Sequence, residues 1–278
     1  MLSQFIKIDD ELTIHYEESG RGKITVLFLP GWTMSTKVFE RQLAYFDESD
    51  KYRFITFDPR AHGLSSKTQD GHFYEQHGRD IGAFIEKLGL ENIVIAGWSF
   101  ATLAVLAYVH QYGATRLSGL IMLDGPPRAA GEDNNKEWLT YRYDDADAMQ
   151  AFYTMGRLTN RETTNSEFAQ WMLENKNSEN IQWVLDITNQ TPDTAAALLN
   201  ATANFLDFRE DLIALHGKIP LLYLVRNEIG ELVSDWASRY TPTAQVHALG
   251  EHLMFWERSD EFNRILTEFL KGCNSKHP

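Results

Sequence analysis

One stretch of ten residues constrains this chain more than any other, because it joins a buried strand to a helix through a single serine. Residues 92–101 read NIVIAGWSFA, with an apolar run at 93–96, and a helical pattern continues to residue 112. A strand, a sharp turn with a central Ser and a helix is the arrangement that exposes a nucleophilic hydroxyl. The turn strains the backbone of Ser99, so its flanks Gly97 and Ala101 must be small. A serine that merely caps the helix is the competing interpretation.

The composition is that of a globular protein with an acidic surface. Apolar residues make up 43% of the 278 residues, charged residues make up 23%, and the net charge is −13. An acidic surface repels phosphate backbones, so we expect no nucleic acid partner. The sequence contains no phosphate-cradling glycine loop and no clustered set of metal ligands, so neither a cofactor nor a metal is expected.

The single cysteine, Cys273, excludes an intrachain disulfide and is typical of a reducing compartment. The first ten residues lack the basic start and the long apolar run of a secretory signal. No apolar run approaches the ~20 residues that are needed to cross a bilayer. We therefore expect a cytoplasmic protein without membrane contact, whose oligomeric state the sequence leaves open.

Apolar strand patterns alternate with helical patterns along most of the chain. Strands are predicted at residues 5–8, 12–16, 24–29, 53–57, 93–96, 118–124, 219–225 and 244–249, and helices at 38–46, 73–90, 101–112 and 259–270. Strands that are apolar throughout are buried on both faces, which is typical of a mainly parallel sheet with helices on both sides.

The strand signals stop between residues 128 and 212. Aromatic and acidic residues recur there with helical spacing, so we expect a helical cap inserted into the α/β core. The predicted organisation is a first core part at 1–127, the cap at 128–212 and a second core part at 213–278.

The expected strand ends collect the candidate site residues, because ligands of such sheets bind at the carboxyl ends of the strands. Ser99 follows one strand, Asp124 follows the next, and His252 follows the last strand after Gly250. A serine nucleophile, an acid that orients a histidine and the histidine base form a catalytic triad when they meet in space. Ser, Asp and His also occur here in the chain order of the fold with this serine turn.

Several ordered blocks resemble the α/β-hydrolase fold superfamily. Residues 58–65, DPRAHGLS, are similar to its D-x-R-G-x-G-x-S block, and residues 250–262 are similar to its G-x-H block and closing helix. The resemblance implies a mostly parallel eight-stranded sheet with a helical cap. It also implies that the backbone amides of Trp32 and Phe100 form an oxyanion hole.

The resemblance leaves two candidates for the acid. Most family members carry it in a G-x-x-D turn after the penultimate strand, where this chain reads VRNEIGE at residues 225–231. Glu228 lies close to the expected position, whereas Asp124 matches a second arrangement with the acid after the strand that follows the serine helix. Asp124 is the preferred acid, and Glu228 is the alternative.

The preferred function is a serine hydrolase that cleaves an ester, thioester or lactone of a small, partly apolar substrate. Residues expected to line the substrate pocket are Trp98, Met34, Trp138 and Phe152. The Pro30-Gly31-Trp32 loop together with Asp124 also resembles the cofactor-independent dioxygenases of 3-hydroxy-4-oxoquinolines, although that group flanks its serine with histidines. A small-molecule receptor on the same fold is the third hypothesis.

Overall fold

The computed structural model describes residues 1–132 and 136–273, with the side chains at 144, 146 and 150 excepted. Three residues of the expected cap and the last five of the second core part therefore lie outside the described residues. The main sheet has eight strands in the order β1-β2-β4-β3-β5-β6-β9-β10. Their bounds are β1 Leu2–Lys7, β2 Thr13–Ser19, β3 Ile24–Leu29, β4 Tyr52–Phe57, β5 Ile93–Trp98, β6 Leu117–Leu123, β9 Leu221–Val225 and β10 Gln245–Ala248.

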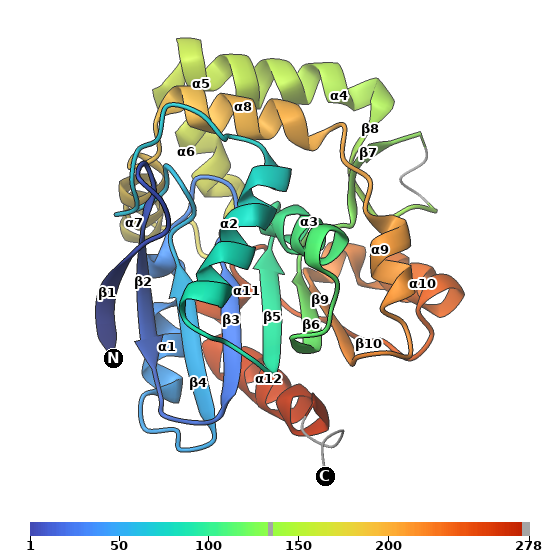
Figure 1. Ribbon diagram of the computed structural model, residues 1–278. Coiled ribbons are helices and arrows are strands. Elements are labelled where there is room, and N and C mark those ends of the chain that lie inside the picture. Colours follow the sequence, from blue (N-terminus) through green and yellow to red (C-terminus); the bar gives the residue numbers. More distant parts are fainter. Residues whose placement is uncertain (133–135, 274–278) are drawn as a thin grey trace.

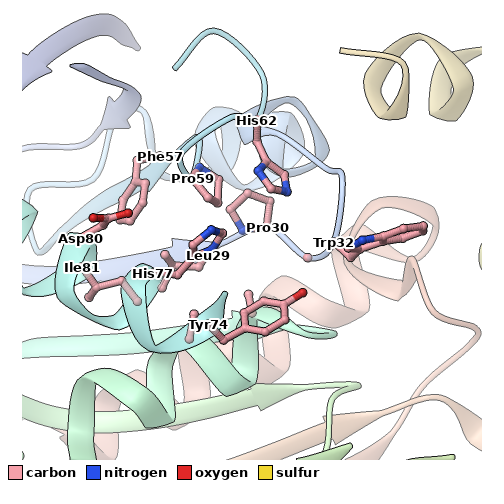
Figure 2. Close-up of a pocket in the computed structure, with 13 residues that line it drawn as sticks. Leu29, Pro30, Trp32, Phe57, Pro59, His62, Tyr74, His77, Asp80 and Ile81 are labelled. Carbon is pink, nitrogen blue, oxygen red and sulfur yellow. The ribbon is translucent and has the colours of Figure 1, made fainter. Parts of the chain in front are cut away.

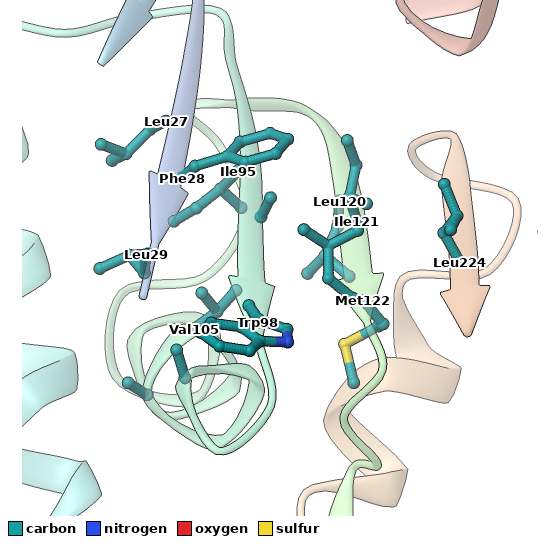
Figure 3. Packing of buried hydrophobic residues seen from close by; sticks show 14 of the residues in the cluster. Leu27, Phe28, Leu29, Ile95, Trp98, Val105, Leu120, Ile121, Met122 and Leu224 are labelled. Carbon is teal, nitrogen blue, oxygen red and sulfur yellow. The ribbon is translucent and has the colours of Figure 1, made fainter. Parts of the chain in front are cut away.

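All strands from β4 to β10 in this order run parallel, and only the edge pair β1 and β2 introduces antiparallel ladders. This sheet confirms the predicted fold class. Its central strands are buried on both faces, as Figure 3 shows for β3, β5, β6 and β9. Continuous apolar runs form such strands because each successive side chain faces a helical layer on one side or the other.

Helices cover both faces of the sheet (Figure 1). One layer holds α2 (Tyr74–Lys87), α3 (Ala101–Tyr112) and α9 (Arg209–Ala214), in which α3 contacts both neighbours. The other layer holds η1 (Thr36–Phe39), α1 (Glu40–Phe46), α11 (Met254–Glu257) and α12 (Ser259–Cys273). The helix α10 (Gly230–Tyr240), preceded by η3 (Asn227–Ile229), packs on β9 and β10.

The segment between β6 and β9 forms the upper part of Figure 1 and contributes no strand to the main sheet among its described residues. Its helical elements are α4 (Tyr143–Met149), the π-helical turn η2 (Gln150–Met155), α5 (Gly156–Thr159), α6 (Arg161–Met172), α7 (Ser178–Thr188) and α8 (Asp193–Ala203). The predicted boundary at residue 212 falls inside α9. Within the described residues, no helix combines the length and the apolar character that crossing a membrane requires.

The expectation of a purely helical insertion is wrong in one respect. Two strands, β7 (Arg128–Gly131) and β8 (Leu139–Arg142), pair in parallel as a small separate sheet. Each has four residues, which is too short for an alternating pattern to stand out in the sequence.

The approach of α3 to β5 depends on Gly97. A Cβ atom on Gly97 would lie 2.6 Å from the backbone of Ala101 and of Thr102. These are main-chain atoms of the first helical turn, so they cannot move aside as a flexible side chain would. Gly97 therefore permits the close contact of strand and helix that holds Ser99 in place.

We predict that Gly97→Ala destabilises the chain by more than about 2 kcal/mol, because the added methyl overpacks main-chain atoms. The matched control is Gly272→Ala in α12, where an added Cβ meets nothing within 4 Å. That control should change stability by less than about 1 kcal/mol. Urea unfolding followed by circular dichroism measures both, and equal stability of the two variants would contradict the steric explanation.

Candidate active site

Ser99 follows β5 in a backbone conformation that side chains rarely adopt. Its φ is 56°, and its amide donates to the Leu123 carbonyl at 2.8 Å, which ties the turn to the end of β6. The space around the turn admits only glycine at two neighbouring positions. A Cβ on Gly31 would lie 2.9 Å from the Ser99 Cβ, and one on Gly125 would lie 2.1 Å from the Ser99 carbonyl oxygen. The N-cap of α3 is Phe100 and not Ser99. The capping interpretation of this serine is therefore wrong.

His252 and Asp124 meet across two strand ends. Nδ1 of His252 donates to Oδ2 of Asp124 at 2.5 Å, and the two side chains are 3% and 0% exposed. Asp124 has a φ of 42°, and its amide donates to the Leu224 carbonyl at 2.9 Å, so the turn after β6 is held by β9. Because Nδ1 is the donor, Nε2 of His252 carries the free lone pair. Among the described residues this Nε2 atom has no hydrogen-bond partner.

Burial and hydrogen bonding act in opposite directions on this pair. Burial disfavours the Asp124 carboxylate, but the hydrogen bond and charge of His252, together with Arg226, outweigh it and hold the pKa of Asp124 below its usual value. For His252 burial is the larger effect and lowers the pKa of the imidazole, although Asp124 counteracts it in part. A neutral His252 beside an ionised Asp124 is the state in which the imidazole can accept a proton.

Glu228, the alternative acid, lies away from His252. It belongs to η3, its side chain is 76% exposed, and its carboxylate accepts from Nε of Arg226 at 3.2 Å. The structure thus brings Asp124 to the histidine and leaves Glu228 on the surface, because β6 ends beside the loop that carries His252 and the Glu228 turn faces solvent.

The two residues whose amides are expected to hold an oxyanion border the same cavity as Ser99. Trp32 lies in the loop after β3, and Phe100 follows Ser99 at the start of α3. Within the described residues, neither of these amides donates a hydrogen bond to a protein acceptor. Free N–H groups beside a serine are what a developing oxyanion requires.

The loop after β3 is held by the DPRAHGLS segment, in which His62 has a structural role. The Thr33 amide donates to Nε2 of His62 at 3.1 Å, while Nδ1 of His62 donates to the Arg60 carbonyl at 2.9 Å. Burial lowers the pKa of His62 to about 3, so the ring stays neutral and keeps its acceptor. The Thr36 amide also donates to Asp58 at 2.6 Å.

A small cavity lies behind this loop (Figure 2). Its volume is about 10 Å³, and its polar lining includes His62, His77 and Tyr74. Burial lowers the pKa of His77 to about 3, and the ring of His77 lies edge-on to His62 at 5.9 Å between centroids. A space of this size accommodates about one water molecule, so it is not a substrate site.

The cavity that contains Ser99 and His252 has a volume of about 320 Å³. Three charged side chains border it besides Asp124, namely Arg142, Asp145 and Arg226. Its aromatic wall is formed by Trp32, Phe100, Trp138, Tyr141, Tyr153, Phe168 and Trp171. Such a mixture of aromatic surface and a few polar groups is typical of a small-molecule site.

Comparison with known proteins identifies the family of this chain. Residues 24–269 match a protein-family model described as alpha/beta hydrolase fold. The chain belongs to this family. The match begins at β3 and ends within α12, so it includes every strand end that carries a candidate residue.

Individual relatives of this α/β hydrolase are esterases and haloperoxidases. A putative non-heme chloroperoxidase of Synechocystis sp. is 26% identical over 281 residues, which cover 94% of this chain and 95% of that protein. A bromoperoxidase structure from Bacillus anthracis has a TM-score of 0.84 at 24% identity, with 97% of this chain and 100% of that chain covered. An esterase from Exiguobacterium antarcticum has a TM-score of 0.80 at 22% identity, with 97% and 100% covered. The two structural likenesses show the shared fold.

Of the four residues expected in the pocket of this hydrolase, Trp138 borders the cavity and the other three do not. Met34 is fully buried in the core, and its amide donates to the Gly31 carbonyl at 3.1 Å. Phe152 packs edge-on against Tyr153, which borders the cavity together with Met149, four residues earlier. Phe152 thus packs beside a residue of the cavity wall and does not itself border the cavity.

Trp98 is the third correction. Side chains alternate along β5, so while Gly97 faces α3, Trp98 faces the opposite helical layer. Its ring lies 4.9 Å from that of Phe255, and its Nε1 donates to the His252 carbonyl at 3.0 Å. Trp98 thus packs against His252 from the side of the sheet and does not border the cavity.

Trp171 is a site residue that the sequence did not single out. Its ring lies 4.5 Å from the His252 ring, which also lies 5.0 Å from Trp98, so the imidazole contacts two indoles. Trp171 and Phe168 both border the cavity and lie three residues apart on α6. That spacing, which places two aromatic rings on one helix face, was the available signal.

The cap is bonded directly to the loop after β3. Nε1 of Trp32 donates to the Ala196 carbonyl in α8 at 2.7 Å, and the hydroxyl of Thr188 donates to that of Thr33 at 2.7 Å. Beneath them Arg157 is fully buried, donates to the Thr191 carbonyl and pairs with Asp193 at 3.2 Å. The cap therefore holds the loop that presents the Trp32 amide.

We predict that Asp124→Asn lowers the pKa of His252 further, by about one unit or more, because the neighbouring negative charge that favours the imidazolium is lost. Glu228→Gln should leave it unchanged, since Glu228 is solvated and has no contact with the ring. Titration of ¹⁵N-histidine-labelled protein by NMR measures both values, with His252→Asn assigning the signal. A larger effect from Glu228→Gln than from Asp124→Asn would reverse the assignment of the acid.

Proposed function

We propose that this α/β hydrolase cleaves an ester, thioester or lactone of a small, partly apolar substrate through a Ser99-His252-Asp124 triad. The observation that carries the proposal is the hydrogen bond from His252 to Asp124, which leaves Nε2 of His252 without a partner among the described residues, on a histidine that borders the same cavity as Ser99. Family membership supports hydrolysis as the reaction class.

In acylation, each residue of the proposed triad and each of the two amides has one role. Nε2 of His252 accepts the proton of Ser99 as Oγ attacks the substrate carbonyl carbon, and the carbonyl oxygen becomes an oxyanion. The Trp32 and Phe100 amides donate to that oxyanion. Collapse of the tetrahedral intermediate breaks the bond to the leaving group, which takes the proton from His252. Asp124 stays ionised throughout and stabilises the imidazolium.

Deacylation repeats the sequence with water as the nucleophile. His252 accepts a proton from water, the resulting oxygen attacks the acyl carbonyl, and Ser99 leaves with the proton returned by His252. The products are a carboxylic acid and the free enzyme, so no redox partner or cofactor enters the balance.

The cavity supports a small substrate with an apolar part. A volume of about 320 Å³ lies at the lower end of the range for small-molecule sites. Rings from both the core and the cap border it, which favours flat or branched apolar groups over long chains. A cytoplasmic location and the absence of nucleic acid or membrane partners remain predictions from composition.

The dioxygenase and receptor hypotheses make opposite predictions about the same residues. A cofactor-free dioxygenase needs His252 as base, does not depend on Ser99 for turnover, and consumes oxygen. A receptor binds a ligand without turnover. Oxygen uptake with a 3-hydroxy-4-quinolone, and ligand-dependent stabilisation without product, are therefore the readouts that would favour these alternatives.

We expect the purified protein to hydrolyse short p-nitrophenyl esters or small lactones, with Ser99→Ala lowering kcat at least about a thousandfold because the nucleophile is lost. A fluorophosphonate probe should add one adduct, located on Ser99 by peptide mass spectrometry. The matched pair Asp124→Asn and Glu228→Gln should separate, with only the first impairing turnover. Absence of turnover across a broad ester and lactone panel, or an active Ser99→Ala variant, would exclude the proposed function.

The pH dependence follows from the lowered pKa of His252. The base is neutral above that pKa, so kcat/KM should rise with pH along one acidic limb and then level off. Because the shift is downward, the midpoint of the limb should lie below 6.5, the ordinary value for histidine. Stopped-flow measurement of ester cleavage over a pH series gives the midpoint, and a value above 7 would contradict the burial of His252.

A further inference from the structure

By the resemblance to the family, Arg226 stands where most members carry the glycine of the G-x-x-D turn, and it contacts Asp124. We propose that Arg226 is a positioning residue of the reaction, which holds the Asp124 carboxylate and sets the pH at which His252 becomes a base. The proposal deepens the function proposed above and rests on it.

Arg226 binds both oxygens of Asp124. Its backbone amide donates to Oδ1 at 3.0 Å, and its Nη1 donates to Oδ2 at 3.1 Å. Oδ2 also accepts from His252 at 2.5 Å. With both oxygens bonded, the carboxylate cannot rotate without breaking a charge-assisted hydrogen bond, so the acceptor of Nδ1 stays fixed.

The guanidinium of Arg226 is itself held by two further groups. Its Nε donates to the exposed Glu228 at 3.2 Å, and its Cζ lies 5.7 Å from the ring centroid of Trp171. The same indole packs on His252. Arg226 therefore contacts the acid directly and the base through one intervening ring, while its side chain remains 22% exposed at the cavity.

The charges around His252 come from few groups. Asp124 lies after β6, Arg226 after β9, and Glu251 precedes the histidine, while the α6 and β5 sides present the uncharged Trp171 and Trp98. Asp124 favours the imidazolium and Arg226 opposes it. A buried acid and histidine without a cation would share a proton tightly and would release the base only at higher pH. The fixed charge of Arg226 prevents that.

The expected consequence is that His252 loses its proton, and can act as a base, at a lower pH than it would without Arg226. Arg226 keeps Asp124 ionised, and the pKa of Arg226 is itself raised despite burial because of its contact with Asp124 and Glu228. The cost is a small electrostatic penalty on the imidazolium in the transition state, which the hydrogen bond that His252 donates to Asp124 offsets.

The test compares Arg226→Gln with Arg226→Lys. The Gln variant removes the charge and keeps a hydrogen-bond donor, so the acidic limb of kcat/KM for p-nitrophenyl acetate should move upward by about 0.5–1 pH unit. The Lys variant keeps the charge, so its limb should stay within about 0.2 unit of the wild type. Glu228→Gln, which removes the solvated partner of Arg226, should also leave the limb in place.

The pKa of His252 from NMR titration should follow the same order and does not depend on turnover. The proposal would be overturned if Arg226→Gln matched the wild type both in the acidic limb of kcat/KM and in the NMR titration of His252. Arg226 would then be an ordinary ion-pair partner of Asp124. If the Gln variant does not fold, Arg226→Met keeps the apolar stem and carries the same expectation. Loss of activity in the Arg226 variants with an active Ser99→Ala variant would instead refute the proposed triad.

Discussion

The close approach of β5 and α3 at Gly97 is the constraint on which the site depends. Gly97 lets the first turn of α3 lie against the strand, and the chain between them must then turn through a positive φ at Ser99. The same turn frees the Phe100 amide and brings the Ser99 amide to the end of β6. One steric condition thus places Ser99 and the Phe100 amide near Asp124, which follows the next strand.

The sequence was sufficient for the sheet, the serine turn and the pairing of Asp124 with His252. Each of these depends on a local pattern that tertiary structure does not override, namely an apolar run, a small flanking residue or a position just after a strand. Parallel strands align their carboxyl ends, so residues far apart in the chain meet there. This rule also identifies Arg226, which directly follows β9, although a polar residue after a strand is common enough to be overlooked.

The cavity wall was the part that sequence reasoning described poorly. Trp98 and Met34 lie in the core and Phe152 does not border the cavity, whereas Trp171 and Tyr153 do. Aromatic residues in the cap have similar composition whether they face the core or the substrate, so only the direction of each helix separates the two. That direction is set by contacts such as Trp32 with Ala196 and Thr188 with Thr33, which join segments more than 150 residues apart in sequence.

In the proposed triad the acid follows β6, whereas the resemblance to the family places an acid turn after β9. The residue after β9 must then still suit the histidine electrostatically. Here that position carries a cation and not a small residue, and the cation bonds the relocated carboxylate. A buried carboxylate needs compensating donors in any arrangement. Here the donor is Arg226, in the turn after β9. The ends of β6 and β9 therefore both influence His252, β6 through Asp124 and β9 through Arg226. Asp124 and Arg226 are therefore best understood as one unit, since Arg226 donates to both oxygens of Asp124, and the Asp124 charge counteracts the effect of burial on Arg226.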